Sequence, residues 1–127
     1  MSSNKTVEKN ILVIDDDITS LDLVSYIFED RGYIVHRAAD GTRALEKVKT
    51  LSPQLFIVDL MMPGINGIDT IREIRKLGFV SEPIIAFTAV DDTEMHDEAT
   101  AAGASIVVTK PCPTELLVKK VKSLLDN

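Results

Sequence analysis

The sequence has no hydrophobic run long enough to cross a membrane. Its longest segments without a charged residue include 83–90 and 99–109, whereas a membrane-spanning helix needs roughly 20 consecutive apolar residues. The N-terminal segment 1–9 contains no apolar signal region, so nothing in it directs secretion. We therefore expect a cytoplasmic protein that does not insert into membranes.

Cysteine and positive charge are also scarce. Cys112 is the single cysteine, which agrees with a reducing compartment. The 20 acidic residues outnumber the 14 basic ones, and the net charge of −6 opposes the attraction to phosphates that drives nucleic-acid binding. Direct nucleic-acid binding is therefore not expected, although the same charge also serves simply to keep a small domain soluble.

No repeat, low-complexity segment or linker divides the chain. Its 127 residues, 45% of them hydrophobic, suffice for one domain with a core and are too few for two. We predict a single domain over residues 9–127, preceded by a flexible tail at residues 1–8.

Short apolar segments alternate five times with longer segments of helical period, a pattern typical of α/β proteins. Most of the short segments are apolar throughout, as strands of a parallel sheet covered on both faces require. Glycines follow several helical segments, where a left-handed residue commonly ends a helix. The predicted strands span residues 10–15, 33–38, 55–59, 83–88 and 105–109, and the predicted helices span residues 18–31, 41–51, 66–77, 92–102 and 114–125.

Polar residues stand at the carboxyl ends of four of these strands. Asp15 and Asp16 end the first strand, Asp59 the third, Thr88 the fourth and Lys110 the fifth. In open α/β sheets, ligands bind just outside the carboxyl ends of the strands, near the point where the strand order reverses. We therefore expect these side chains to converge.

The chemistry of these residues suits a phosphoryl group. Three neighbouring carboxylates repel one another, so a cation must offset their charge. The candidate ligands are oxygens without a cysteine or histidine cluster, which favours Mg²⁺. Lys110 adds a positive charge for phosphate oxygens, the Thr88 hydroxyl can donate a hydrogen bond to one, and Asp59 is the candidate nucleophile. Taken singly, each residue also fits a helix cap, a turn or a solvated side chain, and only their joint placement favours the site.

At these positions the sequence resembles the receiver domains of response regulators, the phosphoacceptor modules of two-component signalling, of the single-domain type. The resemblance covers nearly the whole chain. The motifs that carry it are Ile-Leu-Val-Ile-Asp-Asp-Asp at 11–17, Asp-Leu-Met-Met-Pro-Gly-Ile-Asn-Gly at 59–67, Phe-Thr-Ala at 87–89, Ala-Gly-Ala at 102–104 and Thr-Lys-Pro at 109–111.

The resemblance implies a flavodoxin-like (βα)5 fold, a doubly wound parallel sheet with strand order 2-1-3-4-5. It also implies Mg²⁺, with Mn²⁺ as an alternative ion, held by Asp16, Asp59 and the Met61 backbone carbonyl, with Asp15 contacting the ion through water. The Lys110–Pro111 peptide would be cis by the same resemblance.

The resemblance further implies what the site does. A histidine kinase or a histidine phosphotransfer protein of a phosphorelay would transfer a phosphoryl group to Asp59, and Thr88 and Lys110 would read out the phosphate. The surface around the fourth and fifth helices would then shift to bind a downstream protein target. The chain would catalyse its own phosphorylation and slow dephosphorylation without being a turnover enzyme.

Three departures from the family pattern involve four positions. Val107 stands where an aromatic residue often couples to Thr88, so we expect switching to depend on Thr88 and the loop after it. Cys112 replaces a common bulky apolar residue, and we interpret it as a buried, inert thiol. Met61 and Val90 occupy positions that govern water access to the phosphoryl group; since neither can orient water, we predict slow hydrolysis.

Two surface predictions concern partners. Segment 91–109 contains no lysine or arginine, which argues against the charge-paired receiver dimer of many winged-helix regulators. His96 in this segment is interpreted as a solvated residue. In the first helix, Leu23 and Ile27 fall outside the core-facing stripe and form either a docking patch or a partly covered flank.

One enzyme alternative remains, a haloacid-dehalogenase-like phosphatase with Asp15 as nucleophile. Residues 15–19 match that family's Asp-x-Asp-x-Thr motif, but the motif leaves the segment after Asp59 unexplained. Within the receiver interpretation, a free-standing regulator and a receiver excised from a larger regulator or hybrid kinase both stay open.

Overall fold

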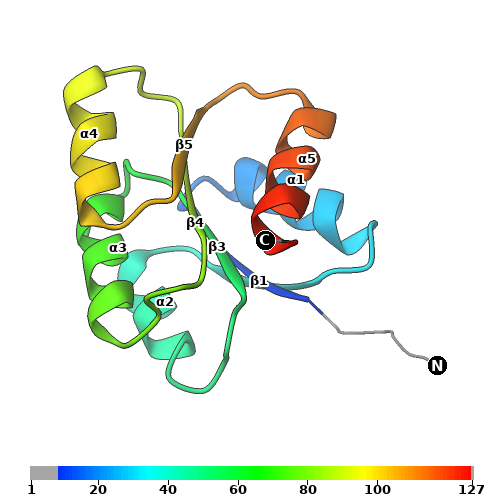
Figure 1. The fold of residues 1–127 in the computed structure, drawn as a ribbon, viewed down its shortest axis with the longest axis horizontal. Helices are drawn as coiled ribbons and strands as arrows, with labels where there is room; N and C mark the ends of the chain where they lie inside the picture. The colour runs from blue at the N-terminus through cyan, green and yellow to red at the C-terminus, as the bar shows by residue number, and fades with distance from the viewer. Residues whose placement is uncertain (1–8, 127) are drawn as a thin grey trace.

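The computed structural model describes residues 9–126; the tail predicted at residues 1–8 lies outside the described residues, as does residue 127. Five parallel strands form one sheet in the order β2-β1-β3-β4-β5, and the chain passes through a helix after each strand (Figure 1). The predicted flavodoxin-like fold is confirmed. The strands are β1 (Asn10–Ile14), β2 (Ile34–Ala38), β3 (Leu55–Val58), β4 (Ile84–Thr88) and β5 (Ile106–Thr109).

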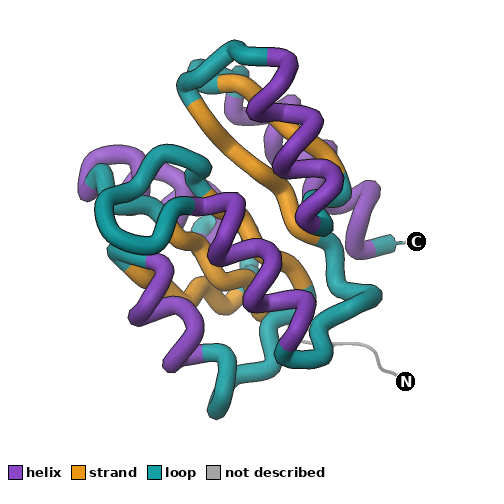
Figure 2. Tube along the Cα trace, turned by 90° about the vertical axis from the view of Figure 1, so that its left-hand side faces the viewer, coloured by secondary structure: helices purple, strands orange, loops and turns teal. Residues whose placement is uncertain are grey.

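The helices form two layers, one on each face of the sheet. They are α1 (Ile18–Glu29), α2 (Gly41–Lys47), α3 (Gly67–Lys76), α4 (Thr93–Ala102) and α5 (Thr114–Leu125). Helices α1 and α5 cover one face, and α2, α3 and α4 cover the other (Figure 1). Figure 2 views this second layer from outside, with the strands behind it. Within residues 9–126, no helix is both long and apolar enough to span a bilayer.

Burial on both faces explains the continuous apolar strands. Successive residues of a strand point to opposite faces. In β1, Leu12 and Ile14 enter the core under α2–α4, whereas Ile11 and Val13 enter the core under α1 and α5. Strand β2 lies at an edge and is less buried than β1, β3 and β4.

The helix boundaries mostly follow local signals. Gly32, Gly78 and Gly103 have φ of 89°, 108° and 128°, the left-handed region that ends helices and favours glycine. The main difference is α2, predicted to reach residue 51 but ending at Lys47. After Lys47 the hydrogen bonds change from the α-helical to the 3₁₀ pattern, because Lys49 N donates to the carbonyl three residues back. The helix passes into a turn there.

The structure settles three smaller predictions. Ile27 is 6% exposed and belongs to the core, so of these two residues Leu23, at 57%, is the one on the surface. His96 is half-buried rather than solvated, and its Nε2 lies 2.8 Å from the Val90 carbonyl oxygen. The Lys110–Pro111 peptide is cis, as the resemblance implied.

Candidate functional site

The carboxyl ends of β1 and β3 bring three carboxylates together. These strands are neighbours in the sheet, and the strand order reverses between them. Each of Asp15, Asp16 and Asp59 offers an oxygen that lies within 4.8 Å of the others. Asp15 and Asp59 are buried, at 4% and 9% exposure, whereas Asp16 faces solvent. The predicted convergence of these aspartates is therefore present in the fold.

Backbone amides hold the two buried carboxylates in place. Oδ1 of Asp15 accepts a hydrogen bond from Asp17 N at 2.9 Å, and Oδ1 of Asp59 accepts one from Met61 N at 3.1 Å. Asp59 N in turn donates to the Ile14 carbonyl at 2.9 Å, which ties the end of β3 to the end of β1. In each carboxylate, Oδ1 is thus held by a backbone amide of the loop that follows it. Oδ2 of each lies on the side of Lys110.

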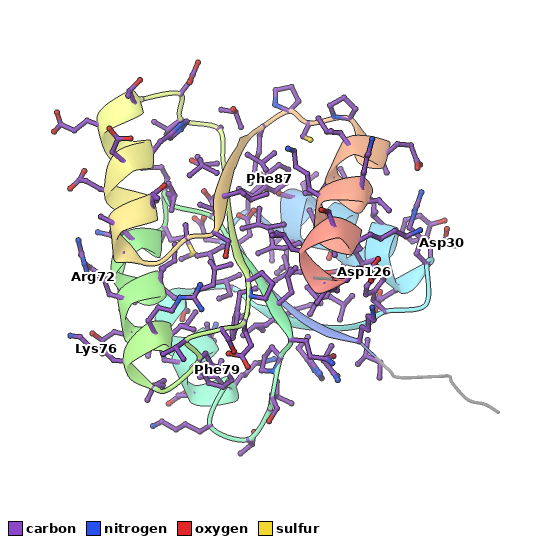
Figure 3. The ribbon with its side chains drawn as sticks, viewed as in Figure 1. Asp30, Arg72, Lys76, Phe79, Phe87 and Asp126 are labelled. Carbon is purple, nitrogen blue, oxygen red and sulfur yellow. The ribbon has the colours of Figure 1, made fainter. Side chains whose placement is uncertain are left out.

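Lys110 bridges the two buried aspartates from the end of β5. Its Nζ lies 2.7 Å from Asp15 Oδ2 and 3.7 Å from Asp59 Oδ2. It also donates to Ser20 Oγ at 2.9 Å and lies 5.2 Å from the ring centroid of Phe87, which is labelled in the upper middle of Figure 3. Sequence reasoning missed Ser20, because a serine inside a helix carries no signal of its own.

Thr88 ends β4 and is fully buried. Its Oγ1 accepts a hydrogen bond from Val90 N at 3.2 Å, and its carbonyl accepts one from Lys110 N at 2.7 Å. Val90 in turn contacts His96 on α4 through its carbonyl oxygen. The hydroxyl predicted to read out a phosphate is therefore connected through one residue to α4.

Burial makes the charge on Asp59 unfavourable. It raises the pKa of Asp59 from its ordinary value of 3.8 to about 6; the Met61 N–H and Lys110 oppose the rise, and Asp15 adds to it. Independently of this shift, three carboxylates share one lysine, so the cluster carries uncompensated negative charge. Closely spaced carboxylate oxygens with uncompensated negative charge are the environment that hard divalent cations prefer, so the residues present fit Mg²⁺.

Gly67 allows the loop after β3 to pass close to Asp59. A Cβ at this position would overlap the Asp59 carbonyl oxygen and would lie 2.5 Å from the Leu60 Cα. Gly67 N also donates to the Leu60 carbonyl at 3.0 Å. The sequence indicated a turn here, but the need for glycine comes from this contact with a segment seven residues away.

The positions that depart from the family pattern differ in burial. The Met61 side chain is 53% exposed, and Val90 is half-buried. Val107 lies on β5 and packs against the core under α2–α4. Cys112 is half-buried rather than fully buried, with its Sγ 3.5 Å from the Pro113 carbonyl oxygen. The Met61 carbonyl as a metal ligand stays a prediction.

Surface shape alone would not have located this site. A hollow of about 520 Å³ is lined by Lys9, Arg31, Gly32, Tyr33, Lys122 and Asp126. These residues precede β1 and β2 or end α1 and α5, so the hollow lies at the amino edge of the sheet, opposite the aspartates. The charge cluster, not cavity volume, identifies the functional edge.

Comparisons with known proteins agree with the geometry. The family model described as the response regulator receiver domain matches residues 11–122. The Mycobacterium tuberculosis protein named DNA-binding response regulator MtrA is 36% identical over 120 residues, which cover 94% of this chain and 52% of that protein. The Bacillus subtilis alkaline phosphatase synthesis transcriptional regulatory protein PhoP is 36% identical over 121 residues, covering 94% of this chain and 49% of that protein. The chain thus spans about half the length of the curated relatives it matches.

Solved structures show the same architecture. The Vibrio cholerae chemotaxis protein CheY4 has a TM-score of 0.90 and 31% identity, covering 94% of this chain and 100% of that chain. The CheY-like receiver domain protein of Methanospirillum hungatei has a TM-score of 0.90 and 30% identity, covering 94% of each. The phosphatase alternative is not supported. Asp17, which belongs to its motif, instead caps α1 by accepting from Thr19 N at 3.1 Å.

Proposed function

Because this chain belongs to the response regulator receiver family, we propose that Asp59 accepts a phosphoryl group from a phosphohistidine. The donor would be a histidine kinase or a histidine phosphotransfer protein. The observation that carries the proposal is the placement of Lys110 between Asp15 and Asp59, inside a cluster of aspartates at the strand switch point. This arrangement places positive charge on both sides of an entering phosphoryl group once a divalent cation is bound.

The chain's own residues supply positioning and charge. An oxygen of the Asp59 carboxylate forms a bond to phosphorus while the P–N bond of the donor breaks, and the electron pair of that bond returns to the imidazole. The Met61 N–H keeps the carboxylate oriented during approach. The Lys110 ammonium, already 3.7 Å from Asp59 Oδ2, can move from Asp15 to the phosphoryl oxygens.

Asp15, Asp16 and Asp59 would hold Mg²⁺, or Mn²⁺, together with the Met61 backbone carbonyl. When bound, the ion neutralises negative charge on the carboxylates and the phosphoryl oxygens. A bound cation also lowers the pKa of Asp59, which further favours the ionised, nucleophilic carboxylate. The chain promotes its own phosphorylation and is not a turnover enzyme.

Readout would begin at Thr88. When the Thr88 hydroxyl turns to donate to a phosphoryl oxygen, it loses the hydrogen bond that its Oγ1 accepts from Val90 N. The loop between β4 and α4 then moves, and the His96 contact with Val90 carries that movement to α4. The surface of α4 and α5 changes in consequence and binds a downstream protein.

The downstream partner would be a protein rather than a nucleic acid. The relatives named as DNA-binding or transcriptional regulators extend well beyond the part that this chain matches. The chain itself carries a net charge of −6, which disfavours direct contact with a phosphate backbone.

The test is incubation with acetyl phosphate and Mg²⁺, with intact mass measured over time. The parent chain and Glu29→Gln, a control at an exposed site on the far face, should each gain one phosphoryl group. Asp59→Asn should gain none, and Asp15→Asn should gain it much more slowly. A phosphoryl group that still appears on Asp59→Asn would overturn the assignment.

A further inference from the structure

A hollow of about 290 Å³ separates α3 from α4, next to the loop that follows Asp59. Four apolar side chains line it: Leu60, Met61, Ile68 and Met95. Leu60 is buried, Ile68 and Met95 are half-buried, and Met61 is 53% exposed. The hollow therefore has an apolar floor and one flexible, exposed thioether at its edge, a combination that adapts to an inserted side chain. We call it the α3–α4 groove.

Helix α4 and the loop before it carry unpaired carboxylates, and one of them, Glu98, lines the groove. The loop before α4 and its first half carry exposed carboxylates at Asp91, Asp92, Glu94, Asp97 and Glu98. None of the nine ion pairs among residues 9–126 involves any of them. On the α3 wall, Arg72 projects outward (Figure 3) but is already paired with Asp69 at 2.8 Å. Of the charged side chains that line the groove, Asp69 and Arg72 pair with each other, which leaves the Glu98 carboxylate without an ion-pair partner among residues 9–126.

We propose that the α3–α4 groove binds a basic, amphipathic segment of a partner protein. An apolar side chain of that segment would sit between Met61 and Met95, and its lysines or arginines would face the α4 carboxylates. The apolar contact would provide affinity, and the charges would provide selection and a faster encounter. This inference rests on the proposed function and extends it, since it adds the α3 side of α4 to the surface that the downstream partner contacts and gives that partner a chemistry.

Met61 connects this groove to the phosphorylation site. Its backbone N–H donates to Asp59 Oδ1, while its side chain lines the groove. Phosphorylation converts the charged carboxylate into an acyl phosphate and so changes the acceptor that fixes Met61. It also adds negative charge close to a site for cations. Both effects make the affinity of the groove depend on the state of Asp59, with tighter binding after phosphorylation.

The test uses two fluorescein-labelled helical peptides with the full chain. One carries leucine and methionine on one face and lysine on the other, and the second has glutamate in place of lysine. Fluorescence anisotropy should show binding of the lysine peptide that weakens as salt is added, and binding of the glutamate peptide about tenfold weaker or absent. With ¹³C-methyl methionine, the lysine peptide should shift the Met61 and Met95 methyl signals and leave that of the buried Met62 in place.

Matched charge reversals locate the site. Glu98→Lys should weaken the lysine peptide about fivefold, whereas Glu29→Lys, the same change at an exposed site on the far face, should leave affinity unchanged. Equal losses in both variants, or binding without a Met95 shift, would overturn the proposal. Met95 shifts that grow with protein concentration and no peptide would identify a second copy as the occupant, and would also overturn it.

The link to Asp59 is measured separately. With Mg²⁺ present throughout, adding beryllium fluoride as a phosphoryl mimic should tighten the lysine peptide about twofold, as expected for one added negative charge near the groove. Unchanged affinity would remove the link through Met61. Intact mass after acetyl phosphate reports phosphorylation of Asp59 itself, so failure of the groove and failure of the proposed function are distinguishable.

Discussion

Replacing Asp59 with asparagine should stabilise the metal-free protein at neutral pH. Burial raises the pKa of this carboxyl from 3.8 to about 6, so the folded state binds its proton more tightly than the unfolded state. The parent therefore loses stability as the pH rises from about 4 to 6, by at most roughly 3 kcal/mol. Asparagine has no charge to bury, and its side-chain oxygen can still accept from Met61 N.

The expected difference follows from this linkage. The Asp59 side chain is 11% exposed, so solvent screens its charge only slightly. Lys110 lowers the pKa of Asp59 and Asp15 raises it, so the charge of Asp59 is coupled to both residues. We expect Asp59→Asn to exceed the parent by about 1 to 3 kcal/mol at pH 7.5 in EDTA, and the two to converge near pH 4. Added Mg²⁺ should stabilise the parent more than the variant, because the variant lacks one ligand.

Urea denaturation at pH 4, 5, 6 and 7.5, followed by circular dichroism, measures this difference. Glu29→Gln serves as the control, because removing an exposed carboxylate should change the unfolding free energy by no more than about 0.5 kcal/mol. If Asp59→Asn were no more stable than the parent at pH 7.5, or if its advantage did not vary with pH, burial would not be the main reason that an ionised Asp59 is unfavourable.

Three further predictions concern Met61, Gly67 and Arg75. Met61→Asn should hydrolyse the phosphoryl group on Asp59 about tenfold faster, because an amide can orient water; equal decay by intact mass would show that Met61 does not shield it. Gly67→Ala should lower the unfolding free energy by about 2 kcal/mol through overlap with the Asp59 carbonyl, as measured in urea, and an unchanged midpoint would contradict the close approach. Arg75→Met should cost about 2 to 4 kcal/mol by removing hydrogen bonds of 2.6 and 3.1 Å to the Gly103 carbonyl, without preventing phosphorylation by acetyl phosphate.

Much of the fold could be read directly from the sequence. A strand buried on both faces must be apolar throughout, so the strand segments were identifiable, and glycines in the left-handed region marked helix ends. The ends of the helices were harder to predict, because the end of α2 at Lys47 depends on a turn rather than on a composition signal. Ile27 was ambiguous for a similar reason: whether the flank of a helix is covered depends on its neighbours.

The candidate site, too, was partly predictable from the sequence and partly decided by the tertiary structure. The sequence by itself determined that aspartates, a threonine and a lysine follow parallel strands, and parallel strands end at one edge of a sheet. Only the tertiary structure decided that Lys110 bridges Asp15 and Asp59 and also contacts Ser20, because these contacts join residues 51 to 95 positions apart. It also decided that glycine is required at position 67 and that an acidic groove opens between α3 and α4. Local sequence records what each segment prefers, whereas a contact or a hollow exists only between segments that folding has brought together.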